Sequence, residues 1–291
     1  MKKITLSFFL ILAFGHFSQS QSFRSQKPGD PFRNTQAFIG LFGGTNFSQP
    51  IIASSYSDFS SIEGQANSLI NDEKTYEGLT QNRGSHFGLS GVFSFNRFFS
   101  ASLSPTYYSI SYSYQSQYIW EEVENPQNYV FYDFKHQQQF RYLSLPFSIR
   151  YSPVGKRVRP YLQVGVHYDR LLDAQKSVTT TGLDRASGGE VNFSRSPQTT
   201  DTDHLYIKSH FGLMAGAGIT YNLGTIAFFL DGQYRYGMHT ITNAQTRYSG
   251  ARDIPGFGNV MDDVSIRNLQ VNLGCYFPLK FLTKEFEPVI L

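Results

Sequence analysis

The amino-acid sequence predicts an all-β protein, an eight-stranded antiparallel up-and-down transmembrane β-barrel. Between Thr35 and Leu279, eight segments rich in Phe and Tyr alternate apolar with small or polar residues over about ten residues each, as barrel strands do. The connections between these segments are alternately long and short, as in a sheet that crosses a membrane up and down. Charged residues make up only 16% of the chain, which is low for a water-soluble domain. A soluble β-sandwich is the alternative, but soluble strands average about 5–6 residues.

The N-terminal residues predict a secretory signal peptide over residues 1–20. Lys2 and Lys3 precede a mostly apolar run over residues 4–14, and small residues follow at the positions that signal peptidase reads, so cleavage is expected before Gln21. A retained anchor is the alternative, although the run is too short to span a bilayer as a helix. We therefore expect an exported chain in the outer membrane of a Gram-negative cell, with both termini periplasmic.

The first half of the barrel follows a polar stretch, residues 21–34, which is expected to be a flexible mature N-terminus. In the first four strands, apolar residues recur at every second position, and the tight turn Asn96-Arg97 separates the second strand from the third. Pro105 cannot donate a ladder hydrogen bond, so irregular pairing is expected inside the third strand. The expected strands are about Thr35–Phe47, Gly84–Phe95, Phe98–Tyr114 and Lys135–Ser152.

The second half of the barrel shows the same alternation, and it is clearest in the seventh strand. There Leu230 and Tyr234 alternate with Asp231 and Arg235, so one face is apolar and the other polar. The barrel is expected to span residues 35–279, followed by a C-terminal tail over residues 280–291. The last four strands are about Val158–Leu172, Leu205–Asn222, Phe228–Gly237 and Val264–Leu279.

The four long connections are expected to be polar, irregular loops on the outer side of the membrane. They span Ser48–Arg83, with a short helix around Ile62–Leu69, and then Gln115–Phe134, Asp173–His204 and Thr240–Asp263. Binding usually resides in loops held on a rigid scaffold. The loops contain aromatic residues that are candidates either for binding or for a membrane-interface belt: Tyr56, Tyr76, Tyr118, Trp120, Tyr129 and Tyr132.

Several strand segments resemble the PorT family of small outer-membrane barrels. IGLFGGTNFS at Ile39–Ser48 is similar to the first strand of that family, and GAGITYNLGTIAFFLDGQYRYGMHTI at Gly216–Ile241 is similar to a later hairpin. FRYLSLPFSIRYSP at Phe140–Pro153, followed by VRPYLQVGVHY at Val158–Tyr168, resembles its most recognisable block. The resemblance covers most of the barrel and none of the long loops. It implies the eight-stranded fold, and it raises a role in type IX secretion, because the family is named after a member needed for that process.

The interior of the predicted barrel is only wide enough for side chains to fill, as in other eight-stranded barrels. Its inward positions include charged residues of both signs, and a buried unpaired charge is very costly. We therefore predict a mutually neutralising polar network inside the barrel, formed by Arg150, His167, Asp169, Asp231 and Arg235. A gate or a proton path is the functional alternative to this structural plug.

The last strand contains a candidate assembly signal. Asn272, Gly274 and Phe277 resemble the pattern by which the barrel-assembly machinery recognises its clients, although residues 280–291 follow here. That tail is expected to be either inert or in contact with a partner. Cys275 alternates onto the lipid-facing side, where a small apolar role is expected.

The sequence lacks the patterns of the common enzymes, so we expect no enzymatic activity. There is no Gly-x-Ser-x-Gly, and nothing pairs a Ser with a His and an acid. TDTDH at residues 200–204 and the pair Asp262-Asp263 lack the glycine and terminal acid of a calcium loop, so no metal or other cofactor is expected. An activity at the outer rim is the remaining alternative, with three candidates: His204, Ser209 and His239.

The predicted function is that of a non-enzymatic scaffold or binding platform. Of 25 Lys and Arg residues two lie in the signal peptide, which leaves 23 against 22 Asp and Glu, so nucleic acid is not an expected partner. The expected partners are outer-membrane lipid, the barrel-assembly machinery during insertion, and an extracellular or secretion-system protein. The alternatives are an accessory component of the type IX secretion or gliding machinery, and a narrow channel for small solutes.

Overall fold

The computed structural model describes residues 36–56, 68–79, 81–122, 124–153, 157–223, 226–247 and 260–279. All of these belong to one compact unit, Pro31–Leu291. The expected signal peptide, flexible N-terminus and C-terminal tail lie outside the described residues. Among the residues that are described, no helix has the length and apolar character needed to cross a membrane.

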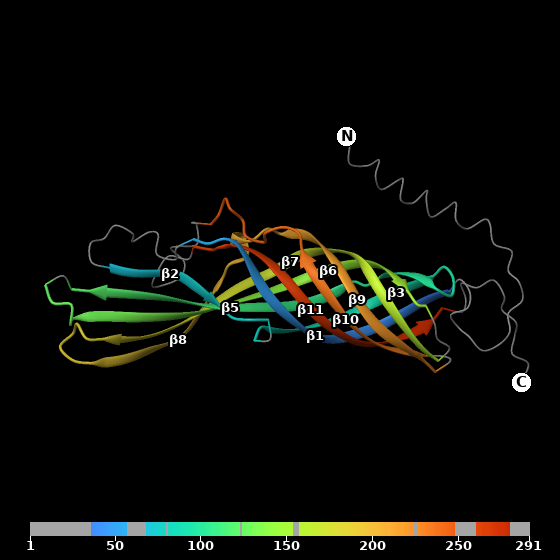
Figure 1. The fold of residues 1–291 in the computed structure, drawn as a ribbon, viewed down its shortest axis with the longest axis horizontal. Coiled ribbons are helices and arrows are strands. Elements are labelled where there is room, and N and C mark those ends of the chain that lie inside the picture. The colour runs from blue at the N-terminus through green and yellow to red at the C-terminus, as the bar shows by residue number, and fades with distance from the viewer. Residues whose placement is uncertain are drawn as a thin grey trace, which may run out of the picture. The chain divides into compact units, whose positions relative to one another are not determined.

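Antiparallel pairing joins every strand of the described residues into one sheet, and the sheet closes on itself (Figure 1). A single turn of 3-10 helix, η2 (Asp203–Leu205), follows the eighth strand. The strands are β1 (Gln36–Ser54), β2 (Ser68–Tyr76), β3 (Arg83–Ser94), β4 (Phe99–Leu103), β5 (Thr106–Glu121), β6 (Tyr129–Tyr151), β7 (Val158–Asp184), β8 (Val191–Asp201), β9 (Ser209–Asn222), β10 (Ala227–Gly237) and β11 (Asp263–Pro278).

The closed ring has eight strand positions within the described residues, which confirms the predicted fold class. β1 pairs with β11 from Phe38 opposite Pro278 onward, and this pairing closes the barrel. β4 and β5 share one ring position, because Ser104 and Pro105 interrupt the strand between them. The irregular pairing predicted at Pro105 is therefore confirmed.

The long connections differ from the prediction, because much of their length is β-strand. The β5–β6 ladder continues outward to the pair Glu121 and Tyr129, so Gln115–Phe134 is a hairpin and not an irregular loop. Similarly, β7 runs on to Asp184 and pairs with β8, which together occupy most of Asp173–His204. The exposed positions of these segments are largely polar, and a strand face that lies in water needs no apolar residues. The polar composition of these two connections was therefore a poor indicator of irregular structure.

The other two connections agree with the prediction only in part. β1 continues past Phe47 to Ser54, and β2 pairs with β5 inside Ser48–Arg83. The expected short helix falls largely outside the described residues, and its last two positions, Ser68 and Leu69, begin β2 instead. In Thr240–Asp263, the described residues contain one isolated bridge, between Tyr206 and Thr242.

Two ends of the barrel can now be defined. The strand extension is the sheet β2-β5-β6-β7-β8, made of β2, β8 and the continuations of β5, β6 and β7 past the closed ring (left in Figure 1). The turn end is the opposite end, where the short connections β3–β4, β6–β7 and β9–β10 lie and where β1 begins and β11 ends (right in Figure 1).

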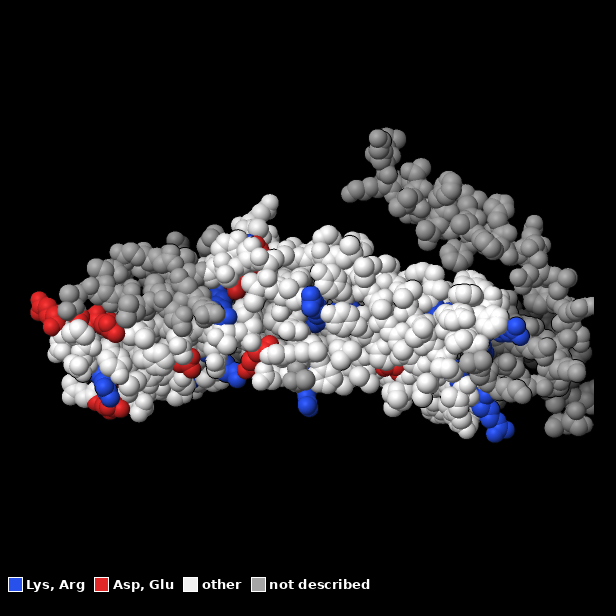
Figure 2. All heavy atoms as spheres, viewed as in Figure 1, with Lys and Arg blue, Asp and Glu red and all other residues white. Residues whose placement is uncertain are grey.

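The wall of the closed ring exposes an apolar band. Its outward side chains are more than a third exposed although they are aliphatic or aromatic, as a surface facing hydrocarbon should be. Charged side chains are sparse over this part of the face shown in Figure 2. Representative members from six strands are Leu41, Phe87, Phe147, Val164, Leu213 and Leu273.

A hydrophobic core lies where the closed ring passes into the strand extension, and it includes inward side chains of the strand extension. Five of its fourteen residues are aromatic side chains from β5 and β6, and Leu205 and Tyr206 from the β8–β9 connection belong to the same cluster together with Ile241 and Met261. Phe140 has its ring centroid 4.7 Å from that of Tyr206 in an edge-on contact. This core closes the end of the barrel that carries the strand extension.

Candidate functional site

The polar interior of the barrel contains a first centre around Asp169 on β7. The Tyr108 hydroxyl donates a hydrogen bond of 2.7 Å to its carboxylate. His167 Nδ1 donates to the same oxygen at 2.8 Å, and His210 Nε2 lies 3.2 Å from it. All four side chains are buried, so the Asp169 carboxylate is held by three donors away from bulk solvent.

A second centre surrounds Asp231 on β10. Its carboxylate accepts hydrogen bonds from the Tyr161 hydroxyl at 2.7 Å, Asn272 Nδ2 at 2.6 Å and Gln233 Nε2 at 3.2 Å. The side-chain oxygen of Asn272 in turn accepts a hydrogen bond from His86 Nε2. A residue predicted for assembly, Asn272, and a residue predicted for the polar network are therefore direct partners.

The two buried arginines are held mainly by neutral groups. Arg150 donates from Nε to Gln163 Oε1 at 3.2 Å and from Nη1 to the Tyr276 hydroxyl at 2.7 Å. Arg235 donates from Nη1 to Ser144 Oγ at 3.1 Å, and its guanidinium lies 5.7 Å from the centre of the Tyr108 ring.

The five residues predicted to form a mutually neutralising network all lie in the buried interior. Within the described residues His167 contacts Asp169, whereas neither Arg150 nor Arg235 forms an ion pair with Asp169 or Asp231. Tyrosine hydroxyls and amides stand between the opposite charges. Sequence reasoning missed the role of three tyrosines, although they share the inward alternation of the predicted residues: Tyr108, Tyr161 and Tyr276.

Glycines on the inward face make room for these large polar side chains. A Cβ atom at Gly212 would collide with the ring of His167, and one at Gly40 would collide with Tyr276. A side chain at either position would displace a member of the interior network. The glycine content of the strands is thus coupled to the polar interior, where close approach of backbone and ring is required.

The predicted assembly residues lie on both faces of β11. Asn272 is buried, and Gly274 occupies an inward position where a Cβ would meet Phe229 and Phe42. Phe277 points outward and is 39% exposed. Cys275, a free cysteine of intermediate exposure, pairs with outward-facing Leu41 and Phe228 on its neighbouring strands.

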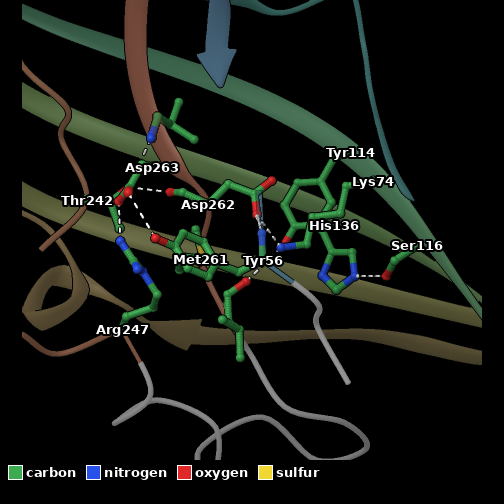
Figure 3. A network of polar contacts seen from close by, with 12 residues as sticks. Tyr56, Lys74, Tyr114, Ser116, His136, Thr242, Arg247, Met261, Asp262 and Asp263 are labelled. Carbon is green, nitrogen blue, oxygen red and sulfur yellow. Dashed lines mark hydrogen bonds and ion pairs between the residues drawn. The ribbon is translucent and has the colours of Figure 1, made fainter. Parts of the chain in front are cut away.

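A second polar network lies at the base of the strand extension (Figure 3). The buried Asp262 carboxylate accepts hydrogen bonds from Lys74 Nζ at 2.8 Å, from the Tyr56 backbone N–H at 2.8 Å and from the Tyr76 hydroxyl at 2.6 Å. The Lys74 and Asp262 side chains are only 2% and 0% exposed. The pair therefore joins β2 to the chain before β11, and Asp262 is a structural acceptor in place of the weak cation ligand considered from sequence.

Neighbouring residues extend this network across the connection between β10 and β11. Arg247 forms an ion pair with Asp263, and its guanidinium stacks 3.7 Å from the centre of the Tyr56 ring. The Thr242 hydroxyl donates to the Asp262 backbone oxygen at 2.6 Å. Sequence reasoning gave no signal for this network, because its members come from segments expected to be separate loops.

His136 on β6 lies beside this network and is held as a neutral imidazole. Its ring stacks on Tyr114 with centroids 4.4 Å apart, and Nε2 lies 2.9 Å from Ser116 Oγ. Burial, together with the positive charges of Lys176 and Lys74, lowers the pKa of His136 well below its ordinary value of 6.5. A neutral histidine here removes one positive charge from a site that already holds two lysines.

The tip of the β7–β8 hairpin is encoded locally. The Asp184 carboxylate accepts hydrogen bonds from the backbone N–H groups of Ala186 at 2.8 Å and Ser187 at 3.1 Å. Gly188 has φ of 90°, a left-handed conformation that glycine adopts without strain. Asp and Gly at these positions therefore fix a tight turn and set the register of the hairpin.

The aromatic candidates from sequence are mostly not free for binding. Tyr118 is buried, and Tyr76 packs against the hydrophobic core with its ring centroid 5.1 Å from that of Tyr114. Trp120 remains 39% exposed near the tip of β5. The exposure of an aromatic side chain thus depends on the face of the sheet to which it belongs. Because these segments were predicted to be irregular loops, the sequence could not assign the side chains to a face.

The rim candidates do not form a compact chemical site. Asp203 forms an ion pair with Lys208, and that hydrogen bond holds the pKa of its carboxyl below the ordinary range. His204 is exposed, and no described residue pairs it with a buried acid. Across the described ranges, no cluster of three or more His, Cys, Asp or Glu side chains is arranged to hold a metal ion.

The closed ring, the outward apolar band and the filled polar interior define an outer-membrane β-barrel. The family model for the outer membrane protein beta-barrel domain matches residues 17–243, well over half of the chain. The chain belongs to this family. Among curated proteins, no sequence match is found.

Solved outer-membrane proteins show similarity at low sequence identity. OprG from Pseudomonas aeruginosa is 13% identical with a TM-score of 0.36, covering 85% of this chain and 98% of OprG. Ail from Yersinia pestis, solved with a heparin analogue, is 15% identical with a TM-score of 0.30, covering 83% and 99%. Neisserial surface protein A is 11% identical with a TM-score of 0.34, covering 83% and 96%. These values transfer no function or residue role from the three proteins to this chain.

Proposed function

We propose that this protein is a non-enzymatic binding platform, in which a barrel anchored in the outer membrane holds the strand extension outside the cell. The observation that carries the proposal is the length of three strands. β5, β6 and β7 contain 16, 23 and 27 residues, whereas a strand needs only about 9–11 residues to cross a bilayer. The surplus continues the same ladders beyond the apolar band.

The outward face of β6 supports an aqueous location for the strand extension. In the ring its exposed residues are Leu143, Leu145, Phe147 and Ile149, whereas in the strand extension they are Lys135, Gln137 and Gln139. Hydrocarbon tolerates the first set and would be a costly solvent for the second. The change occurs within one continuous strand, so it marks the level at which the surrounding solvent changes.

The edge strand β8 is the best candidate contact surface on the platform. It pairs with β7 on one side, and its position at the end of the sheet order leaves its other edge without a strand partner among the described residues. Nearly every residue of β8 is exposed. An extended peptide of a partner could add to such an edge through main-chain hydrogen bonds. Pro197 and the register shift beside Val178 limit uncontrolled pairing along the same edge.

The closed interior supports a non-enzymatic and non-conducting role. The Asp169 and Asp231 centres are buried, and the hydrophobic core closes the barrel between them and the strand extension. The donors on both carboxylates are Tyr, His, Asn and Gln, with no Ser or Cys nucleophile among them. Planar bilayer recordings of the purified protein should therefore show no steady, large single-channel openings.

The orientation is tested by cysteine labelling on intact cells. Cys275 is the only cysteine, so Cys275→Ala gives a cysteine-free background. Ser187→Cys at the β7–β8 tip should then react with a membrane-impermeant maleimide, and Asn96→Cys at the turn end should react only after lysis. The opposite pattern would reject the proposed orientation.

The binding role is tested by photo-crosslinking in intact outer membranes. A benzophenone amino acid placed at Arg195 or Gln198 of β8 should give discrete adducts with extracellular or cell-surface proteins. The matched control is the same amino acid at exposed Asn96. A second variant replaces Ser177–Thr199 with a two-residue turn, and the barrel should still fold. If the partner spans the sheet, this variant should give no adducts with a probe placed at Trp120. Equal adducts at β8 and at Asn96 would argue against a platform.

We further propose that the chain is a PorT-type barrel, with an accessory role in type IX secretion as the second candidate function. The proposal rests on the segments at Phe140–Pro153 and Val158–Tyr168, which lie mainly in the ring portions of neighbouring strands β6 and β7. Deleting the gene and comparing the secreted proteins tests the second role. An unchanged set of secreted proteins would remove it and leave the binding platform untouched.

A further inference from the structure

A small cavity lies at the turn end, on the opposite side of the polar interior from the strand extension. Its volume is about 40 Å³, room for about three water molecules or one small ion. Three arginines line it, Arg97, Arg150 and Arg159, and none of its described lining residues is Asp or Glu. On the face shown in Figure 2, the charged side chains visible at the turn end are Lys or Arg.

Two of the three arginines are buried. Arg150 is 6% exposed and Arg159 is 7% exposed, whereas Arg97 lies at the surface. Arg159 donates from Nη2 to the backbone oxygen of Arg97, which draws the two residues together at the rim. The cavity thus has two buried guanidinium groups and one surface guanidinium group in its lining.

Arg150 has no carboxylate within ion-pair distance in the described part of the chain. Its hydrogen-bond acceptors, Gln163 and the Tyr276 hydroxyl, are neutral. Asp231 is an interior carboxylate, but Tyr161, Gln233 and Asn272 already donate to it. The Tyr161 ring lies between, with the Arg150 guanidinium 5.0 Å from its centre. Arg150 therefore faces the cavity as a cation without a direct counter-charge.

The rest of the lining contains hydroxyl groups beside Asn96 and four apolar side chains, Phe38, Val92, Phe98 and Phe99. The hydroxyl groups belong to Ser94, Ser100, Ser152, Thr220 and Tyr276, whereas the hydroxyl of Tyr161, which also lines the space, already donates to Asp231. Guanidinium and hydroxyl donors that converge on a small volume match the several acceptor oxygens of a tetrahedral anion. A metal cation would be repelled by the arginines, and an apolar ligand would leave the donors unsatisfied.

We infer that this cavity is a binding site for a small oxyanion, such as a phosphate group, which neutralises Arg150 at the mouth of the barrel. The oxyanion group can belong to free phosphate or to the headgroup of a lipid. Binding would tie the ends of β4, β6, β7, β9 and β11 together, because each of these strands contributes a lining residue. The inference is independent of what binds to the strand extension.

The test uses the purified full chain in a phosphate-free sugar detergent. The measurement is the temperature at which the folded, fast-migrating species disappears on SDS gels, with sodium phosphate compared with sodium chloride at equal ionic strength. Phosphate should raise this temperature in the wild type and in the control variant Arg83→Gln, whose side chain is exposed outside the cavity lining. A parallel arm with short-chain phosphatidic acid distinguishes a lipid headgroup from free phosphate, and a response to either supports the site.

Three variants decide the outcome. Arg150→Gln should weaken phosphate binding by at least about tenfold, because a charge-assisted hydrogen bond is lost. Thr220→Glu places a carboxylate in the cavity, so it should raise the unfolding temperature without phosphate and abolish the response to it. If Arg150→Gln does not fold, Thr220→Glu and the rim variant Arg97→Gln decide. A wild type that responds equally to chloride, or folded Thr220→Glu and Arg97→Gln variants that respond like the wild type, would overturn the inference.

Discussion

The two parts of β6 follow one alternation but bury opposite chemistry. In the ring, Ser144, Ser148 and Arg150 point inward, and Leu143 and Phe147 point outward. In the strand extension the inward side chains include Phe134 and Phe140, and the outward ones include Lys135, Gln137 and Gln139. The change takes place between Tyr142 and Ser144 on the inner face, and at Arg141 and Leu143 on the outer face.

This inversion shows what each environment demands of the same backbone. Lipid accepts only apolar side chains, so the polar residues of the ring must point inward and satisfy one another. Water accepts polar side chains, so the strand extension can place its apolar residues in a conventional core. The level of inversion therefore separates two mechanisms of stabilisation, one based on hydrogen bonds and the other on hydrophobic burial.

The largest expected effect is on the inner face of the strand extension. Phe140→Ala removes a fully buried ring that contacts Tyr206, and the cavity left behind should cost about 3–5 kcal/mol. The matched ring variant Ser148→Ala removes one hydrogen bond to Ser102 and should cost about 1 kcal/mol. Urea unfolding followed by fluorescence of Trp120, the only tryptophan, measures both. Equal losses of unfolding free energy in the two variants would contradict the proposed difference between the two inner faces.

The outer faces give the next largest difference. Phe147→Arg puts a charge in the middle of the apolar band and should destabilise the folded barrel in lipid vesicles by about 2–4 kcal/mol. Gln137→Arg, ten positions along the same strand, should change the unfolding free energy by less than about 0.5 kcal/mol because its side chain is already in water. Urea unfolding in vesicles measures both variants. A similar cost for Gln137→Arg would place the lipid boundary farther along β6.

A smaller effect separates two buried tyrosines. Tyr161→Phe removes one donor from the buried Asp231 carboxylate and should cost about 1–3 kcal/mol. The Tyr142 hydroxyl is buried without a hydrogen-bond partner among the described residues, so Tyr142→Phe should be neutral or stabilising. The same unfolding measurement compares the two hydroxyl deletions. A destabilised Tyr142→Phe would show that the polar network continues past the inversion level.

The ring was predictable from sequence because lipid imposes a strict pattern. Every second residue of a ring strand faces hydrocarbon, so alternation, short turns and the interruption at Pro105 could be recognised one strand at a time. The inward placement of Arg150 and Asp231 followed from the same alternation. Their partners did not follow, because Tyr161 and Tyr276 come from strands whose register sequence alone does not define.

The strand extension was not predictable to the same degree, because water relaxes the pattern. The outward face there is rich in Ser, Gln and Thr, which are as common in loops as on solvated strands. The ion pair of Lys74 with Asp262 joins residues 188 positions apart, and no local signal marks it. The hairpin tips did carry turn chemistry, with Asp184 and Gly188 between β7 and β8 and Asn125-Pro126 between β5 and β6.

The smallest expected effect is a pH dependence that affects the strand extension and not the ring. Folding lowers the pKa of His136 well below 6.5, so above that pH the imidazole is mostly neutral in both the folded and the unfolded chain. As the pH falls below 6.5, the unfolded chain binds a proton that the folded chain does not, and the strand extension loses stability. Limited proteolysis at pH 7.5 and pH 5.5, which are about one unit on either side of the ordinary histidine value, should show faster cleavage within the strand extension at the lower pH. His136→Gln should remove this difference while the ring stays resistant. An unchanged pH dependence in His136→Gln would assign the effect to another group.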